Sequence, residues 1–294
     1  MADLAMQAGV PGEIFSVITG DAAQIGDAFF DSNEVRKFTF TGSTPVGKML
    51  LERSAKTLKK VSLELGGNAP FIVFDDANLE DAVNGALIAK FRNAGQTCVC
   101  VNRFLVQAGI YEQFIQRLSE KMQDFSVGNG LAGRHDIGPL INHQAVQKVQ
   151  SHIQDALDKG AKLIAGGQPH ADGALFFEPT LIADVTPDMD VATQETFGPL
   201  AAVFKFETER QALEMANDTD FGLASYCYTN NLGRAWRMSQ QLEYGMVGIN
   251  KGIISNEVAP FGGVKHSGLG REGSKYGIED YMEIKYTLFG GLEE

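Results

Sequence analysis

The chain has 294 residues, of which 44% are hydrophobic and 21% charged, a balance typical of a folded protein with room for more than one domain. Its formal net charge is −12 and no cluster of lysine and arginine relieves this acidity, which argues against a nucleic-acid partner. The sequence has no apolar run of about 18 residues and no signal-peptide pattern, and its few cysteines (Cys98, Cys100 and Cys227) cannot build a disulfide framework. We therefore expect a cytoplasmic protein without a membrane partner.

Helix and strand signals alternate from the start of the chain. Residues 1–11 are typical of the end of a helix closed by Gly9 and Pro11, which predicts a domain already in progress at Met1. Such alternation favours an α/β fold with a largely parallel sheet. The expected strands in this part are 14–18, 37–41 and 60–65, and the expected helix is 44–56.

The middle of the chain keeps the same rhythm. Residues 70–74 are typical of a buried strand, and Asn78 is placed to cap a helix that reaches about Phe91. Further strands are expected at 103–107, 201–206 and 225–229, and helices at 110–125, 142–159, 208–216 and 231–241.

Residues 245–277 are rich in glycine. This composition fits an ordinary surface loop, and it equally fits a long loop that covers a site and needs close backbone approach. Beyond it, residues 280–288 alternate enough to predict a terminal strand. Because an exposed terminal strand needs a partner, pairing between subunits is expected there.

Cys98 is the first candidate for chemistry. A cysteine is more often a small buried apolar residue, but residues 93–97 before Cys98 are polar and turn-forming. Cys100 would point the opposite way in an extended segment and begins an apolar stretch. We therefore predict that Cys98 is the nucleophile and that Cys100 faces away.

Glu64 is the candidate base. It ends an apolar strand and precedes two glycines, a position where a carboxylate is commonly solvated. Its leucine neighbours predict instead a partly apolar setting that raises its pKa and suits a base.

Two further segments have a functional and an ordinary interpretation. Gly42 and Ser43 lie in a strand-to-helix turn whose backbone amides could bind a phosphate, although an ordinary turn is also possible. Glu195 is either a loop charge or a carboxylate that holds a hydroxyl group, such as one of a ribose. The histidines have no metal-ligand spacing, so no metal site is expected.

Taken together, the motifs at 40–43, 64–67, 95–98, 195–199 and 260–268 resemble the aldehyde dehydrogenase superfamily over essentially the whole chain. Residues 91–100, 252–257 and 268–277 are most similar to its succinate-semialdehyde dehydrogenase branch.

The resemblance implies an aldehyde dehydrogenase fold and NAD(P)-dependent oxidation of an aldehyde, with succinate semialdehyde as the expected substrate. Cys98 would form a thiohemiacetal and then a thioester, and Glu64 would activate the water that hydrolyses it. The residues implied at the NAD or NADP cofactor are Gly42, Ser43, Leu65, Glu195 and Phe197.

Arg92 and Ser255 match positions that hold the distal carboxylate of a semialdehyde acid, although an arginine at a helix end is as often simply solvated. Lys251 departs from the branch, and a cation there could alter the substrate entrance. In this branch a second thiol can form a reversible disulfide with the nucleophile, which makes Cys100 a redox-regulatory candidate.

The resemblance also implies a domain organisation. Residues 1–66 would be the C-terminal half of a Rossmann-like NAD(P)-binding domain, 67–265 the α/β catalytic domain, and 275–294 an oligomerisation tail of a homodimer or homotetramer. Family members are longer at the N-terminus, so we expect weak cofactor binding by this chain alone. Two alternatives stay open: a truncated, non-catalytic chain that associates with full-length subunits, and a thiol esterase that works without cofactor.

Overall fold

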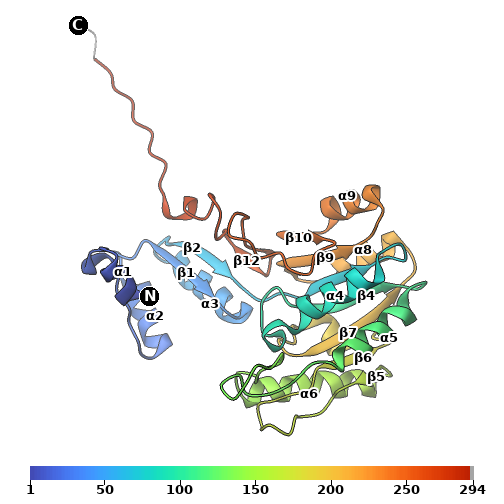
Figure 1. Cartoon of the computed structure of the whole chain (residues 1–294). Coiled ribbons are helices and arrows are strands. Elements are labelled where there is room, and N and C mark those ends of the chain that lie inside the picture. Colours follow the sequence, from blue (N-terminus) through green and yellow to red (C-terminus); the bar gives the residue numbers. More distant parts are fainter. Residues whose placement is uncertain (292–294) are drawn as a thin grey trace.

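The structure, a computed structural model, describes residues 1–291 and contains two separate main sheets. Figure 1 shows the smaller sheet beside the N-terminal helices and the larger sheet in the rest of the body. No helix in the described residues is both long and apolar enough to span a bilayer.

The smaller sheet is built from a β-α-β unit. Strand β1 (Lys37–Thr41) is parallel to β2 (Lys60–Glu64), and helix α3 (Thr44–Ala55) connects them, as the sequence predicts. Helix α2 (Ala22–Asp31) begins at Asp21, whose side chain accepts a hydrogen bond from the Gln24 amide. The sheet is completed from far along the chain, because β12 (Gly268–Leu269) pairs antiparallel with β2.

The larger sheet has seven strands in the order β10-β9-β3-β4-β7-β6-β5, all parallel except β5. The strands are β3 (Ala69–Val73), β4 (Val101–Gln107), β5 (Lys162–Ala165), β6 (Thr180–Ala183), β7 (Leu200–Phe206), β9 (Ala224–Tyr228) and β10 (Met246–Ile249). A small ribbon, β8 (Phe221–Gly222) with β11 (Val264–Lys265), lies outside it. The expectation of a largely parallel α/β sheet is confirmed.

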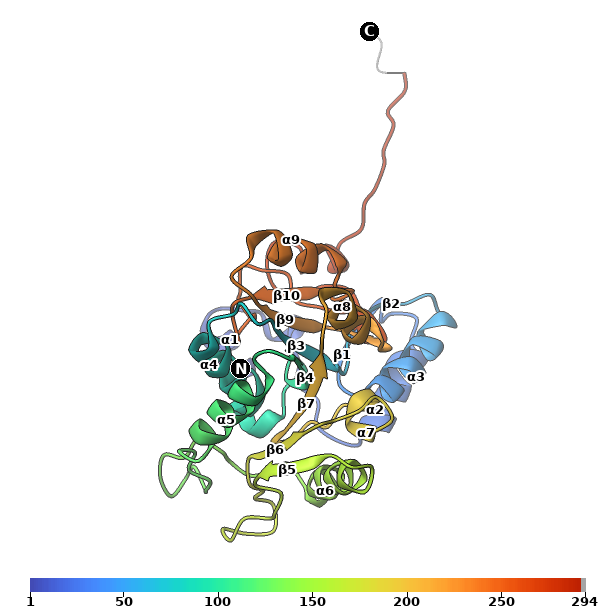
Figure 2. The same cartoon turned by 90° about the vertical axis from the view of Figure 1, so that its right-hand side faces the viewer.

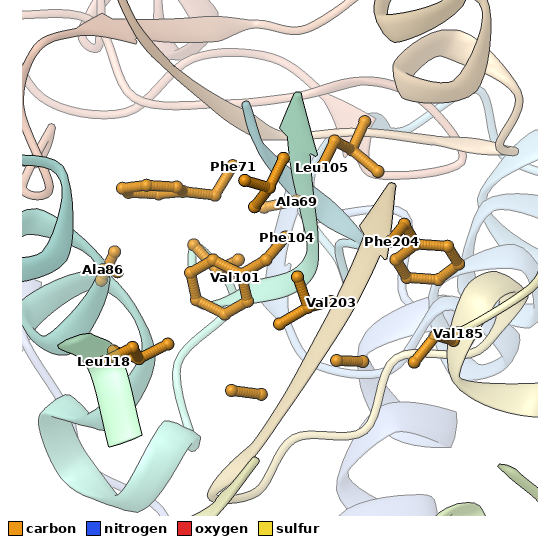
Figure 3. Close-up of a cluster of buried hydrophobic side chains, with 14 of the residues drawn as sticks. Ala69, Phe71, Ala86, Val101, Phe104, Leu105, Leu118, Val185, Val203 and Phe204 are labelled. Carbon is orange, nitrogen blue, oxygen red and sulfur yellow. The ribbon is translucent and has the colours of Figure 1, made fainter. Parts of the chain in front are cut away.

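Helices cover both faces of this sheet, which is why its central strands are almost continuously apolar. Figure 2 shows α4 and α5 on one side and α7 and α8 on the other. Figure 3 shows Phe104 of β4 close to Ala86 and Leu118, which come from α4 and α5. The helices are α4 (Leu79–Phe91), α5 (Tyr111–Met122), α6 (His143–Asp158), α7 (Asp190–Thr193), α8 (Glu209–Asn217) and α9 (Leu232–Gln241). Asn78 caps α4 as expected, because its side chain accepts from the Asp81 amide at 3.2 Å.

The strand expected at 14–18 is wrong. Residues 14–18 begin with the last residue of a 3-10 turn (Gly12–Ile14) and continue as an unpaired segment, while the helix expected before them is present as α1 (Ala2–Gln7). Ile14, Val17 and Ile18 are 74%, 65% and 61% exposed, because no described strand lies beside them to form a ladder. Helix α2 and strands β5, β6 and β10 were not predicted.

The C-terminal segment leaves the body of the molecule. Residues 280–288 contain the end of a 3-10 turn (Glu279–Tyr281) and then unpaired backbone, so the strand expected there has no partner within the described chain. Figure 1 shows this tail running away from both sheets. Apolar side chains along it, such as Ile284 and Phe289, are exposed. The last residues of the predicted tail, 292–294, lie outside the described residues.

Candidate active site

The predicted catalytic residues meet where the two sheets approach each other. Glu64 ends β2 of the smaller sheet, while Cys98 and Phe197 shortly precede β4 and β7 of the larger one. The carboxyl end of β2 therefore faces the amino ends of β4 and β7. A short link, residues 65–68, joins the two sets.

Cys98 lies in a tight turn between α4 and β4. The Cys100 amide donates to the Thr97 carbonyl at 3.0 Å, and the buried Tyr226 hydroxyl donates to the Val99 carbonyl at 2.8 Å. Before the turn, Asn93 and Ala94 both have φ of 54°, a left-handed conformation that costs energy for residues with a Cβ. These contacts hold the Cys98 thiol at a half-buried position rather than in the core.

The Cys98 thiol is hard to ionise in this setting. Burial, followed by the charges of Glu195 and Glu64, raises the pKa of Cys98 to about 11. The backbone amides of Cys98 and Val99 act in the opposite direction, because they stabilise the thiolate. At neutral pH the thiol is therefore protonated and needs a nearby base to become a nucleophile.

Glu64 has the properties of that base. Its side chain is buried at 4% exposure, and Oε2 has no hydrogen-bond partner among the described residues. Burial first and the charge of Glu272 second raise the pKa of Glu64 to about 8, while Arg271 lowers it. The glycine-rich segment lies over it, since a Cβ on Gly262 would be 2.9 Å from Oε1. Of the two interpretations of that segment, the cover over a site fits the structure.

Gly66 and Gly67 are glycines because of close approach. A Cβ on Gly66 would lie 2.8 Å from Oε2 of Glu195, and one on Gly67 would lie 2.7 Å from the Cys98 carbonyl oxygen. The link between the sheets therefore passes between the nucleophile turn and the Glu195 carboxylate with no space for a side chain.

We predict that Gly67→Ala destabilises the fold and displaces the Cys98 turn. The added methyl meets a backbone atom that cannot rotate away, so a loss of about 1–3 kcal/mol in unfolding free energy is expected. Urea denaturation measures it, with Gly138→Ala as the control because a Cβ there meets nothing within 4 Å. Equal unfolding midpoints for the two variants would contradict the predicted crowding.

The residues predicted at a cofactor lie around the same junction. Oε1 of half-buried Glu195 accepts from the Gly67 amide at 3.1 Å, and burial raises the pKa of Glu195. Phe197 is 37% exposed with φ of 54°. The Gly42 amide donates to the Glu64 carbonyl at 3.0 Å, and Ser43 immediately precedes α3. The Leu65 side chain packs against Gly47 of α3.

An apolar cavity of about 720 Å³ lies beside the turn that contains Gly42 and Ser43. It is enclosed by α2, β1, α3 and the segment before α2, with Phe29, Phe38 and Phe40 among its lining side chains. Its walls belong to the smaller sheet and its helices.

The predicted substrate residues are exposed. Arg92 follows α4, and its side chain makes no hydrogen bond or ion pair with any residue in 1–291, although its charge affects the pKa of Tyr226. Ser255 and Lys251 lie in the exposed loop after β10. The loop packs on α4, the helix that Arg92 follows, since a Cβ on Gly252 would lie 2.3 Å from the Gly85 carbonyl oxygen, and no hydrogen bond joins Ser255 to Arg92 within the described residues.

Cys100 is buried in the core and contacts Lys90 of α4. It is 5% exposed, and its sulfur lies 3.4 Å from the Lys90 ammonium nitrogen and donates to the Lys90 carbonyl. Lys90 itself is fully buried and donates to the Val101 carbonyl at 2.8 Å. A Cys98–Cys100 disulfide stays a prediction.

Several site residues were missed. The Ser267 hydroxyl is fully buried, donates to the Gly66 carbonyl at 2.8 Å and accepts from the Gly222 amide. Arg271 and Glu272 set the charge around Glu64. All three lie in the 245–277 segment, within the motifs at 260–268 and 268–277 that carry the family resemblance but gave these residues no role. Asn102, in β4, had none.

With this geometry described, the chain can be compared with known proteins. The sequence pattern of the aldehyde dehydrogenase family matches residues 1–287. The chain belongs to this family.

Its relatives include several dehydrogenases of small aldehydes. It is 78% identical to succinate semialdehyde dehydrogenase of Acinetobacter baylyi and 60% identical to 3-sulfolactaldehyde dehydrogenase of Pseudomonas putida, in both cases over 99% of this chain and 60% of the relative. A solved succinate-semialdehyde dehydrogenase from Burkholderia pseudomallei superposes with a TM-score of 0.94 at 58% identity, over 95% of this chain and 58% of that one. The chain thus spans about 60% of the length of the curated relatives it matches.

Proposed function

We propose that this chain carries out the thioester chemistry of an NAD(P)-dependent oxidation of an aldehyde to a carboxylate. The observation that supports it most is the convergence of the Cys98 turn and the unpartnered Glu64 carboxylate on the Gly66–Gly67 link. Glu64 would first take the thiol proton, and the Cys98 sulfur would then attack the aldehyde carbon. The backbone amide of Cys98 is suited to stabilise the resulting oxyanion.

When bound, NAD(P)⁺ accepts the hydride of the aldehyde carbon. The acyl group then remains on Cys98 as a thioester. Glu64 would first release the thiol proton to solvent and would then remove a proton from water as the water attacks this thioester. This step releases the carboxylate, and Glu64 returns its second proton to the Cys98 sulfur. Overall, an aldehyde, water and NAD(P)⁺ give a carboxylate, NAD(P)H and two protons.

The residues around α3 fit a dinucleotide. The helix begins directly after Gly42 and Ser43, where free backbone amides and the helix dipole favour a phosphate. The adjacent apolar cavity has room for a purine ring. Glu195 has one oxygen committed to Gly67, which leaves the other for a ribose hydroxyl. Leu65 and Phe197 complete the proposed site. These features do not distinguish NAD from NADP.

For the substrate we propose succinate semialdehyde. The named substrates of the two relatives above each carry an anionic group in addition to the aldehyde. Arg92 supplies an unpaired guanidinium for such a group, and Ser255 could donate to it.

Arg92→Leu should raise the KM for succinate semialdehyde by at least about tenfold, because a charge-assisted contact to the carboxylate is lost. Butanal, which has the same chain length without the carboxylate, serves as the matched substrate and should change by less than about threefold in kcat/KM. Steady-state kinetics on both aldehydes measures the difference. An equal loss of kcat/KM on both aldehydes would show that Arg92 does not bind the substrate carboxylate.

We further propose a cytoplasmic homo-oligomer. Support comes from the exposed apolar side chains of the unpaired tail and from β10, an edge strand of the larger sheet that such a tail could extend in a second copy. We also propose the domain limits 1–66, 67–265 and 275–294, because the first of these boundaries falls in the link between the sheets.

The deciding experiment is NADH or NADPH absorbance with purified chain and succinate semialdehyde. Aldehyde-dependent reduction supports the proposal. Ester hydrolysis through Cys98 without cofactor reduction would instead favour a thiol esterase. A folded chain with neither activity would favour the non-catalytic alternative.

A further inference from the structure

Asn102 is a buried polar residue that the proposed mechanism does not use. It is the second residue of β4, two positions after Cys100, and it is 3% exposed. A carboxamide has both donor and acceptor atoms, and burial without partners would be costly. Its hydrogen bonds therefore indicate why it is tolerated in the core.

The carboxamide of Asn102 joins two loops that are far apart in sequence. Its Nδ2 donates to the Gly67 carbonyl at 3.3 Å, and its Oδ1 accepts from the Thr196 amide at 3.4 Å. The Gly67 amide in turn donates to Oε1 of Glu195, the neighbour of Thr196. These contacts close a ring that runs from Asn102 to Gly67, Glu195, Thr196 and back.

Thr196 is also held from its other side. Its hydroxyl lies 3.0 Å from Nδ1 of His152, a buried residue of α6. The loop that carries Glu195 is thus anchored to α6 on one side and to β4 on the other. Of these anchors, only Asn102 connects directly to the Gly67 backbone that holds the Glu195 carboxylate.

We propose that Asn102 is a positioning residue, which acts through Gly67 and Thr196 to hold the Glu195 carboxylate beside Cys98. This inference rests on the proposed function only in taking Cys98 as the reactive thiol. Asn102 does not touch the reacting atoms. It determines where the Glu195 charge lies relative to the Cys98 sulfur.

A measurable consequence is the acidity of the Cys98 thiol. The charge of Glu195 is the second cause, after burial, of the raised pKa of Cys98. If the ring is opened, the loop and its carboxylate can move away from the sulfur and towards water. Asn102→Ala should therefore lower the pKa of Cys98 by at least about half a unit, which is about a threefold faster alkylation at pH 8.

The experiment is the pH dependence of iodoacetamide alkylation at Cys98, followed by mass spectrometry of its peptide. Full pH profiles separate a shift in the pKa from a change in access, because access alters the rate equally at every pH. Glu195→Gln removes the charge and should lower the pKa of Cys98 as well. In the Glu195→Gln background, Asn102→Ala should add no further shift, because its effect passes through the Glu195 charge.

Asn250→Ala is the matched control. The carboxamide of Asn250 also binds backbone groups. It accepts a hydrogen bond from the Thr229 amide and donates one to the Thr229 carbonyl, both at 3.0 Å. Thr229 follows the carboxyl end of β9, whereas Cys98 precedes the amino end of β4, so the two residues lie at opposite ends of the parallel strands. The control should lose stability and leave the Cys98 profile unchanged.

Two results would overturn the proposal: a wild-type Cys98 profile in Asn102→Ala, or a shift that persists in full without the Glu195 charge. If Asn102→Ala does not fold, Asn102→Ser is the milder variant, and the same criteria apply to its profile. The assay needs no dehydrogenase activity. A shifted profile in a chain that oxidises no aldehyde would leave the positioning role intact and contradict only the proposed reaction.

Discussion

Cys98→Ser is expected to abolish acyl chemistry, with a loss of at least about 1,000-fold in turnover. A serine hydroxyl ionises far less readily than a thiol, and Glu64, with a pKa of about 8, is too weak a base to activate it. Aldehyde oxidation and ester hydrolysis should fall together, because both require the acyl-enzyme. The measurement is turnover of both substrates, with mass spectrometry to detect an acyl group on the chain.

Cys227→Ala provides the control for this substitution. Cys227 is fully buried in β9, so its removal should cost some stability and leave the acyl chemistry in place. Ester hydrolysis that persists in Cys98→Ser would end the assignment of Cys98 as the nucleophile.

Glu64→Gln is expected to block hydrolysis of the thioester, with a loss of about 100-fold or more in steady-state turnover. The amide can take a proton neither from the Cys98 thiol nor from water, so acylation should slow as well, and any acyl group that does form on Cys98 should persist and be visible by mass spectrometry. In the unsubstituted chain, deacylation should rise with pH through about 8, because the carboxylate form of Glu64 appears above that value. The variant should lack this rise.

The pH dependence of stability in the unsubstituted chain and in Glu64→Gln gives an independent check on the raised pKa of Glu64. The pKa of Glu64 is raised from 4.5 to about 8, so between these values the folded state keeps a proton that the unfolded state has released. The free energy of unfolding must then fall as pH rises through this window. Urea titrations at pH 5 and pH 9 should show a larger fall for the native chain than for Glu64→Gln. Equal falls in unfolding free energy would mean that the pKa of Glu64 is not raised in the folded state.

Local chemistry made much of the fold predictable. Asn78 before an apolar periodic run predicted the start of α4, and alternating strand and helix signals predicted the parallel sheet. The strand expected at 14–18 failed because an apolar run carries no information on whether a partner strand lies beside it. Strands β5 and β6 are too short for a periodic signal.

The residues of the candidate site also divide into those that could be predicted from the sequence and those that could not. Cys98 and Glu64 could be proposed because their neighbours are unusual for a cysteine and for a carboxylate. Asn102 could not, since its role depends on Gly67 and Thr196, which tertiary folding brings to it from distant parts of the sequence. The same holds for Ser267, because the pairing of β12 with β2 brings it to Gly66, which lies 201 residues earlier in the sequence.

The meeting of the two sheets has a mechanical consequence. The nucleophile precedes β4 of one sheet and the base ends β2 of the other, and the chain joins these sheets both at 65–68 and between β10 and β12. The reach of Glu64 towards the Cys98 turn is therefore set by the packing between the two sheets. Substitutions that alter the packing between the sheets should therefore change the rate of the Glu64 proton transfers without touching either reactive side chain.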